Sequence, residues 1–174
     1  MRKIALLFWV FSISAMALGE PSYLLEDERN TIEIFEKTSP RVVNVSNMRY
    51  ARVGFFSFDV TEIPAGTGSG FIWDAAGYIV TNYHVIRGAD RLTVAFKNGK
   101  TISAKVIGVE PRKDIAVLKV KETSTEGFEK FPLSDSSRLL VGQKTVAIGS
   151  PFGLDQTLTK GVISALGRSI PGVG

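Results

Sequence analysis

The sequence has no cysteine and only one histidine, His84, in 174 residues. The lack of cysteine excludes disulfide bonds, thiolate metal sites and a cysteine nucleophile. One histidine without cysteines also leaves no cluster of the usual metal ligands. The fold must therefore be held together by its hydrophobic core alone.

The sequence also has no large excess of either positive or negative charge. The 21 basic and 17 acidic residues leave a net charge of +4, and no dense block of lysine and arginine occurs. Nucleic-acid binding has little support, because phosphate contacts need clustered positive charge. Hydrophobic residues make up 44% and charged residues 22%, which is typical of a globular protein with a real core.

No apolar run reaches the roughly 20 residues that a membrane-spanning helix needs. The longest such run, residues 4–13, follows Arg2 and Lys3 and precedes the small residues Ala17 and Gly19. This layout predicts a secretory signal peptide over residues 1–19, cleaved after Ala17 or Gly19. The protein is then exported, to a bacterial periplasm or the extracellular space. An uncleaved anchor is the alternative.

Apolar residues at helical spacing predict a short helix over residues 25–37, which Ser39-Pro40 ends. Short β-rich runs separated by turn residues follow, and Asn98-Gly99 between two of them predicts a hairpin. Many short strands at close spacing indicate an all-β antiparallel sandwich or barrel. We expect strands at residues 42–45, 70–73, 78–81, 92–96, 104–109, 114–120, 144–148 and 157–164.

Two segments fall outside this pattern. Residues 50–64 are expected to be irregular, and their phenylalanines, Phe55, Phe56 and Phe58, either form an interaction surface or fold back onto the barrel. The polar residues 121–130 are typical of a linker between two halves. The glycines of residues 66–70 lack the spacing of a nucleophile elbow and no helix follows them, so close strand packing is expected there.

His84 and Asp114 are the candidate site residues. His84 ends a predicted strand, where a general base could be presented, although a lone histidine is more often structural or merely exposed. Asp114 opens the apolar run 115–118, which we expect to be buried on both faces, so its carboxylate would need a partner. The sequence is equally consistent with Asp114 being a surface aspartate that ends the turn at residues 111–113. Together, however, a histidine and an aspartate on neighbouring strands match the base and its orienting group in a serine hydrolase.

Several motifs, in order, resemble those of the Deg/HtrA serine proteases, and the similarity runs from about Asp27 to the C-terminus. Residues 66–71 and 78–86 are similar to the histidine region of that family, and residues 113–118 to its aspartate motif. Three further segments resemble the opening of the family's second barrel: residues 141–144, 147–154 and 159–164.

The resemblance implies a chymotrypsin-like double β-barrel and makes His84 the general base and Asp114 its orienting partner. It implies no cofactor, unfolded or misfolded proteins as substrates, and a homotrimer. The chain would then divide into a helical segment (20–40), a first barrel (41–122), a linker (123–130) and the start of a second, incomplete barrel (131–174).

The resemblance also implies a Gly-Asn-Ser-Gly-Gly motif some dozens of residues after residues 161–164, and the 174 residues do not contain it. We therefore expect the nucleophilic serine and the amides of its oxyanion hole to be missing, and this chain alone to be inactive. The alternative is a non-catalytic β-barrel protein that associates with a full-length protease and modulates it.

Overall fold

The computed structural model describes residues 23–52, 60–121, 128–150 and 156–168. It begins with helix α1 (Glu26–Thr38), close to the predicted range. Acidic residues fill the first turn, where they favourably face the positive end of the helix dipole, and Glu28 accepts a hydrogen bond from the backbone of Leu25. Pro40, in the 3-10 turn Ser39–Arg41, ends the helix as expected. Among the described residues, no helix is long and apolar enough to cross a membrane.

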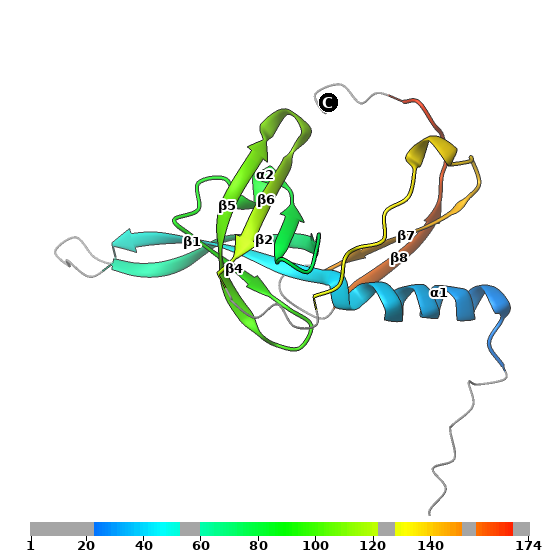
Figure 1. Ribbon diagram of the computed structural model, residues 1–174, viewed down its shortest axis with the longest axis horizontal. Helices are drawn as coiled ribbons and strands as arrows, with labels where there is room; N and C mark the ends of the chain where they lie inside the picture. The colour runs from blue at the N-terminus through cyan, green and yellow to red at the C-terminus, as the bar shows by residue number, and fades with distance from the viewer. Residues whose placement is uncertain (1–22, 53–59, 122–127, 151–155, 169–174) are drawn as a thin grey trace, which may run out of the picture.

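Six antiparallel strands then close into a barrel, which confirms the predicted fold class (Figure 1). Around the barrel they run in the order β1, β2, β3, β6, β5, β4, so β3 pairs with β6 across a gap in sequence. Their bounds are β1 (Val42–Arg52), β2 (Val60–Ile72), β3 (Tyr78–Thr81), β4 (Arg91–Ala95), β5 (Thr101–Glu110) and β6 (Ile115–Val120).

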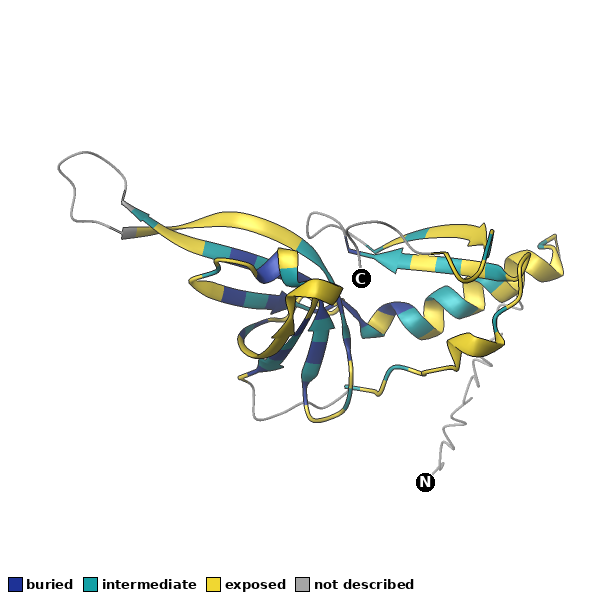
Figure 2. Ribbon diagram, turned by 90° about the horizontal axis from the view of Figure 1, so that it is seen from above, coloured by how far each residue is buried: buried dark blue, intermediate teal, exposed yellow. Residues whose placement is uncertain are grey.

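Buried residues alternate with more exposed ones along β3, β4 and β6, as the period of two requires, whereas residues 42–45 of β1 are all buried (Figure 2). The largest fully buried apolar side chains are those of Val43, Val45, Ile72, Ile79, Val94, Leu118 and Val120. The close packing expected around residues 66–70 is present, because a Cβ atom on Gly68 would lie 2.4 Å from Val85 and one on Gly70 would lie 2.9 Å from the Val80 carbonyl. The Asn98-Gly99 hairpin also forms, with Gly99 at φ +81° between β4 and β5.

Two expectations about the strands were wrong. Residues 50–64 are not irregular throughout, because β1 continues to Arg52 and β2 already begins at Val60, so the two strands pair beyond the barrel as a ribbon. The side chains of Arg91 and Glu62, 2.9 Å apart, tie this ribbon to β4. Phe55, Phe56 and Phe58 lie outside the described residues. β6 is not buried on both faces either, since Ile115 is exposed while Ala116 and Leu118 are buried.

A second sheet of two antiparallel strands, β7 (Lys144–Gly149) and β8 (Thr157–Val162), lies beside α1, away from the barrel (Figure 1). It fits the beginning of a second barrel. Backbone groups of Ser150, just after β7, bind the first barrel: its N–H donates to Ser69 Oγ (2.9 Å) and its carbonyl accepts from Asn44 Nδ2 (3.0 Å). The side-chain amide of Gln156, just before β8, donates to the backbone carbonyls of Ser39 and Val42.

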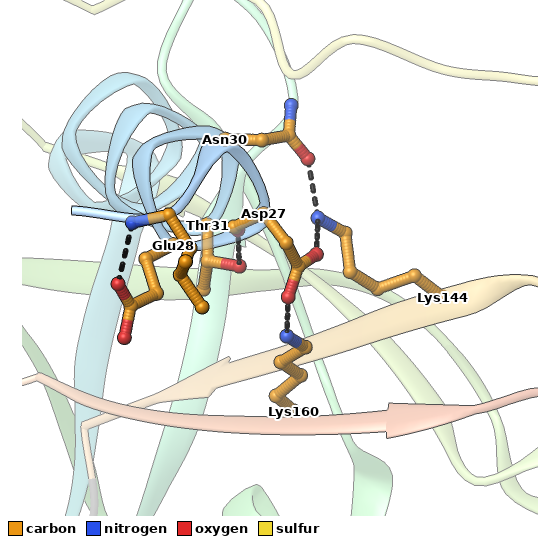
Figure 3. A network of polar contacts seen from close by, with 7 residues as sticks. Asp27, Glu28, Asn30, Thr31, Lys144 and Lys160 are labelled. Carbon is orange, nitrogen blue, oxygen red and sulfur yellow. Dashed lines mark hydrogen bonds and ion pairs between the residues drawn. The ribbon is translucent and has the colours of Figure 1, made fainter.

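A polar cluster also joins α1 to the second sheet (Figure 3). One carboxylate, that of Asp27, accepts hydrogen bonds from Lys144 on β7 (3.1 Å) and from Lys160 on β8. Lys144 also donates to Asn30, one helical turn further along. One acidic side chain thus bridges both strands of the second sheet and holds them against the N-terminal helix.

We predict that Asp27→Asn loosens α1 from β7 and β8. The hydrogen bonds of Lys160 and Lys144 hold the pKa of Asp27 below its ordinary value of 3.8. The stabilisation is therefore present above that value, is lost as the pH falls through the lower folded pKa, and is weakened by salt. At neutral pH, hydrogen exchange of α1 and β8 amides should be faster in the variant than in the wild type, while amides of β3 and β6 keep their protection.

The matched control is Glu33→Gln, which removes an ion pair with Lys37 within the same helix and leaves the second sheet untouched. Equal exchange in α1 and β8 for wild type and Asp27→Asn would contradict the bridging role.

Candidate active site

The antiparallel pairing of β3 with β6 brings the two candidate residues together. Thr81, the last residue of β3, lies opposite Ala116 near the start of β6. The chain that leaves β3 and the chain that enters β6 therefore meet at the same end of the barrel. His84 and Asp114, 30 positions apart in sequence, lie on these two segments.

His84 lies on a one-turn helix, α2 (Tyr83–Ile86), and not on the end of a strand as predicted. The strand ends at Thr81, and Val85 and Ile86 of the helix join the barrel core. Burial of these two side chains directs the neighbouring imidazole outward, where 67% of its side-chain surface is exposed.

Asp114 does not open β6 but precedes it, after the 3-10 turn Pro111–Lys113. Its backbone is left-handed (φ 54°, ψ 42°), a conformation that aspartate tolerates better than most residues. Its N–H donates to the Pro111 carbonyl (3.2 Å). The turn thereby aims the carboxylate at α2 instead of along the strand.

The two side chains are in direct contact. Nδ1 of His84 lies 2.6 Å from Oδ2 of Asp114, and the backbone N–H of His84 donates to Oδ1 (2.8 Å). This backbone hydrogen bond, and after it the ring contact, hold the pKa of Asp114 below its ordinary value of 3.8. An ionised carboxylate can only accept, so a neutral imidazole must carry its proton on Nδ1, which leaves the lone pair of Nε2 free to take a proton.

Sequence reasoning missed Asn82, whose side-chain amide donates to the Asp114 carbonyl (3.0 Å). No local signal pointed to this role, because the hydrogen bond joins residues 32 positions apart in sequence. In the part of the chain that the structure describes, no hydroxyl is hydrogen-bonded to Nε2 of His84.

An apolar groove of about 1020 Å³ lies beside the histidine–aspartate pair. It runs between the outer face of the barrel and β7, and it reaches Asn82 and Ile115, which are within two residues of the pair. Its other apolar lining includes Phe71, Trp73, Val117, Phe131 and Ile148. Over the described ranges, no three histidine, aspartate or glutamate side chains are grouped as metal ligands would be.

Comparison with known proteins shows the family of the chain. Residues 68–173, more than half of the chain, match the trypsin-like peptidase domain. The chain belongs to the trypsin-like peptidase family. Within that family its relatives are the Deg/HtrA serine proteases, as the sequence motifs indicated.

Three of these peptidases illustrate the similarity. "Protease Do-like 1, chloroplastic" of Arabidopsis thaliana is 48% identical over 92% of this chain. A "probable periplasmic serine endoprotease DegP-like" of Hahella chejuensis is 36% identical over 95%, and the "periplasmic pH-dependent serine endoprotease DegQ" of Escherichia coli is 39% identical over 78%. The chain spans 36%, 39% and 32% of the length of these proteins, respectively.

We predict that Asp114→Asn makes this peptidase fold less stable in a pH-dependent way. The substitution keeps the size of the side chain and an acceptor for the His84 backbone, so it removes mainly the charge. Because the folded pKa of Asp114 is lowered, the wild type should be the more stable protein above pH 3.8, and this advantage should vanish as the pH falls through the folded pKa. Urea unfolding of both proteins across this pH range measures the difference in their free energy of unfolding. A difference that stays constant with pH would contradict the prediction.

Proposed function

We propose that these residues supply the general base and its orienting carboxylate to a serine endopeptidase of the Deg/HtrA type. The observation that carries the proposal is the 2.6 Å contact between His84 Nδ1 and Asp114 Oδ2 at one rim of the barrel. In this role Asp114 keeps the imidazole in the tautomer with a free Nε2. It also stabilises the imidazolium that forms when Nε2 takes the proton of a serine hydroxyl.

The serine itself has no candidate among the described residues. Ser69 uses its Oγ to accept the Ser150 backbone N–H, and Ser150 is buried. We therefore propose that the 174 residues alone do not hydrolyse peptide bonds. In this proposal the base lacks, among the described residues, both a hydroxyl to deprotonate and a pair of amides for an oxyanion.

The groove beside the pair supports unfolded or misfolded proteins as ligands. Its lining is aromatic and aliphatic, and a chain that exposes apolar side chains in an extended form could bury them there. The same lining favours the second candidate function, a non-catalytic protein that binds a full-length protease and modulates it. Association into a homotrimer is a further proposal, which the resemblance alone supports. No cofactor enters the proposed chemistry.

We predict that the purified chain is not labelled by a fluorophosphonate probe, which reacts with an activated serine. A full-length Deg protease serves as the positive control in the same assay. Labelling at Ser69, Ser150 or Ser164 would show that the nucleophile lies within these residues. Labelling that disappears in His84→Ala would further show that it is activated by this histidine. Co-purification with a full-length protease, without labelling, would favour the modulating role.

Residues 1–19 are proposed to be a signal peptide that directs export to a periplasm or the extracellular space. When the chain is produced in a bacterium, the mature protein should begin at Leu18 or Glu20, as N-terminal sequencing would show. The control Leu7→Arg interrupts the apolar run and should leave the protein uncleaved. A wild-type product that retains Met1 and is bound to the membrane would indicate an anchor instead.

A further inference from the structure

Asp114 needs unusual support for its backbone. Of the described residues other than glycine, it is the one with a positive φ, a conformation that L-amino acids disfavour. Such a residue persists only where its surroundings hold it in place. The direction of its carboxylate follows from this backbone, so whatever holds the backbone also sets the contact with His84.

The support comes from the start of helix α2. The first two helical residues, Tyr83 and His84, donate their backbone N–H groups to Asp114, to its carbonyl (3.1 Å) and to its Oδ1 (2.8 Å), respectively. Both N–H groups lack a partner within the helix, and that of His84, the second helical residue, is one that a capping side chain ordinarily satisfies. Asp114, 30 positions further along the chain, thus acts as the cap of this helix.

Because Asp114 accepts these hydrogen bonds, the side chain of the residue at the capping position is available for another partner. Asn82 precedes the helix with an extended backbone, yet its side chain does not cap it. Its amide instead donates to the Asp114 carbonyl (3.0 Å), which also receives the Tyr83 N–H. Asn82 is exposed, so packing in the core does not explain its position.

We propose that Asn82 is a positioning residue that holds the Asp114 carbonyl and thereby fixes the Asp114 carboxylate against His84. One donor, the Tyr83 N–H, restrains the direction of this carbonyl less than two donors do. A second donor from a different direction restrains it further. The importance of the pair rests on the proposed function, but its geometry can be tested without any serine.

The experiment uses the full chain with ¹⁵N-labelled histidine, which gives the signals of one imidazole only. At neutral pH the wild type should show a protonated Nδ1 and a slowly exchanging proton in the hydrogen bond to Asp114. In Asn82→Ala and Asn82→Asp, neither of which can donate an amide hydrogen, the population with a protonated Nδ1 should fall. Exchange of that proton with water should become about two- to tenfold faster, as expected for the loss of one hydrogen bond.

Asn98→Asp is the matched control. It adds the same charge in an exposed turn and keeps the acceptor that binds the Lys100 N–H, so the imidazole signals should stay as in the wild type. Asn82→Gln retains the amide, so its population with a protonated Nδ1 should lie between those of Asn82→Ala and the wild type. Unchanged imidazole signals in Asn82→Ala would overturn the proposal. Loss of cooperative unfolding in that variant would overturn it too, because Asn82 would then be needed for the fold and not specifically for the pair.

Discussion

The pairing of β3 with β6 is the constraint on which the site depends. These strands are separated by β4 and β5 in sequence but are neighbours in the closed barrel, and their antiparallel register places Thr81 opposite Ala116. Without this pairing, His84 and Asp114 would lie on unrelated segments. The core residues Ile79 and Leu118, which are opposite each other in the same register and fully buried, stabilise it. The burial that folds the barrel therefore also assembles the pair.

The same strand end is linked to the second sheet. The hydroxyl of Thr81 donates to the Ser69 carbonyl (2.8 Å), and the hydroxyl of Ser69 accepts the backbone N–H of Ser150, which follows β7. Three hydrogen-bonded residues thus connect the segment before His84 to the second sheet. Helix α1 also holds that sheet through Asp27, so polar contacts join the second sheet both to the barrel and to the N-terminal helix.

The sequence allowed prediction of the features that follow from periodicity. The barrel strands, the Asn98-Gly99 hairpin and the helix ended by Pro40 all have local signals, and the resemblance to Deg/HtrA proteases singled out His84 and Asp114 as partners. Local signals failed where tertiary contacts decide the conformation. The short helix that carries His84 has no capping side chain of its own and depends on Asp114. The left-handed backbone of Asp114 likewise depends on donors that lie far away in sequence.

The exposure of the pair determines what else its chemistry needs. Water reaches 67% of the His84 side chain and 36% of that of Asp114, and it weakens the attraction between carboxylate and imidazolium through its high dielectric constant. Proton transfer in such a pair becomes effective when a low-dielectric environment replaces this water. The apolar groove reaches Asn82 and Ile115, which are within two residues of the pair in sequence, while neither His84 nor Asp114 lines it. A ligand in the groove would therefore have to extend past these two residues before it displaced water from the pair.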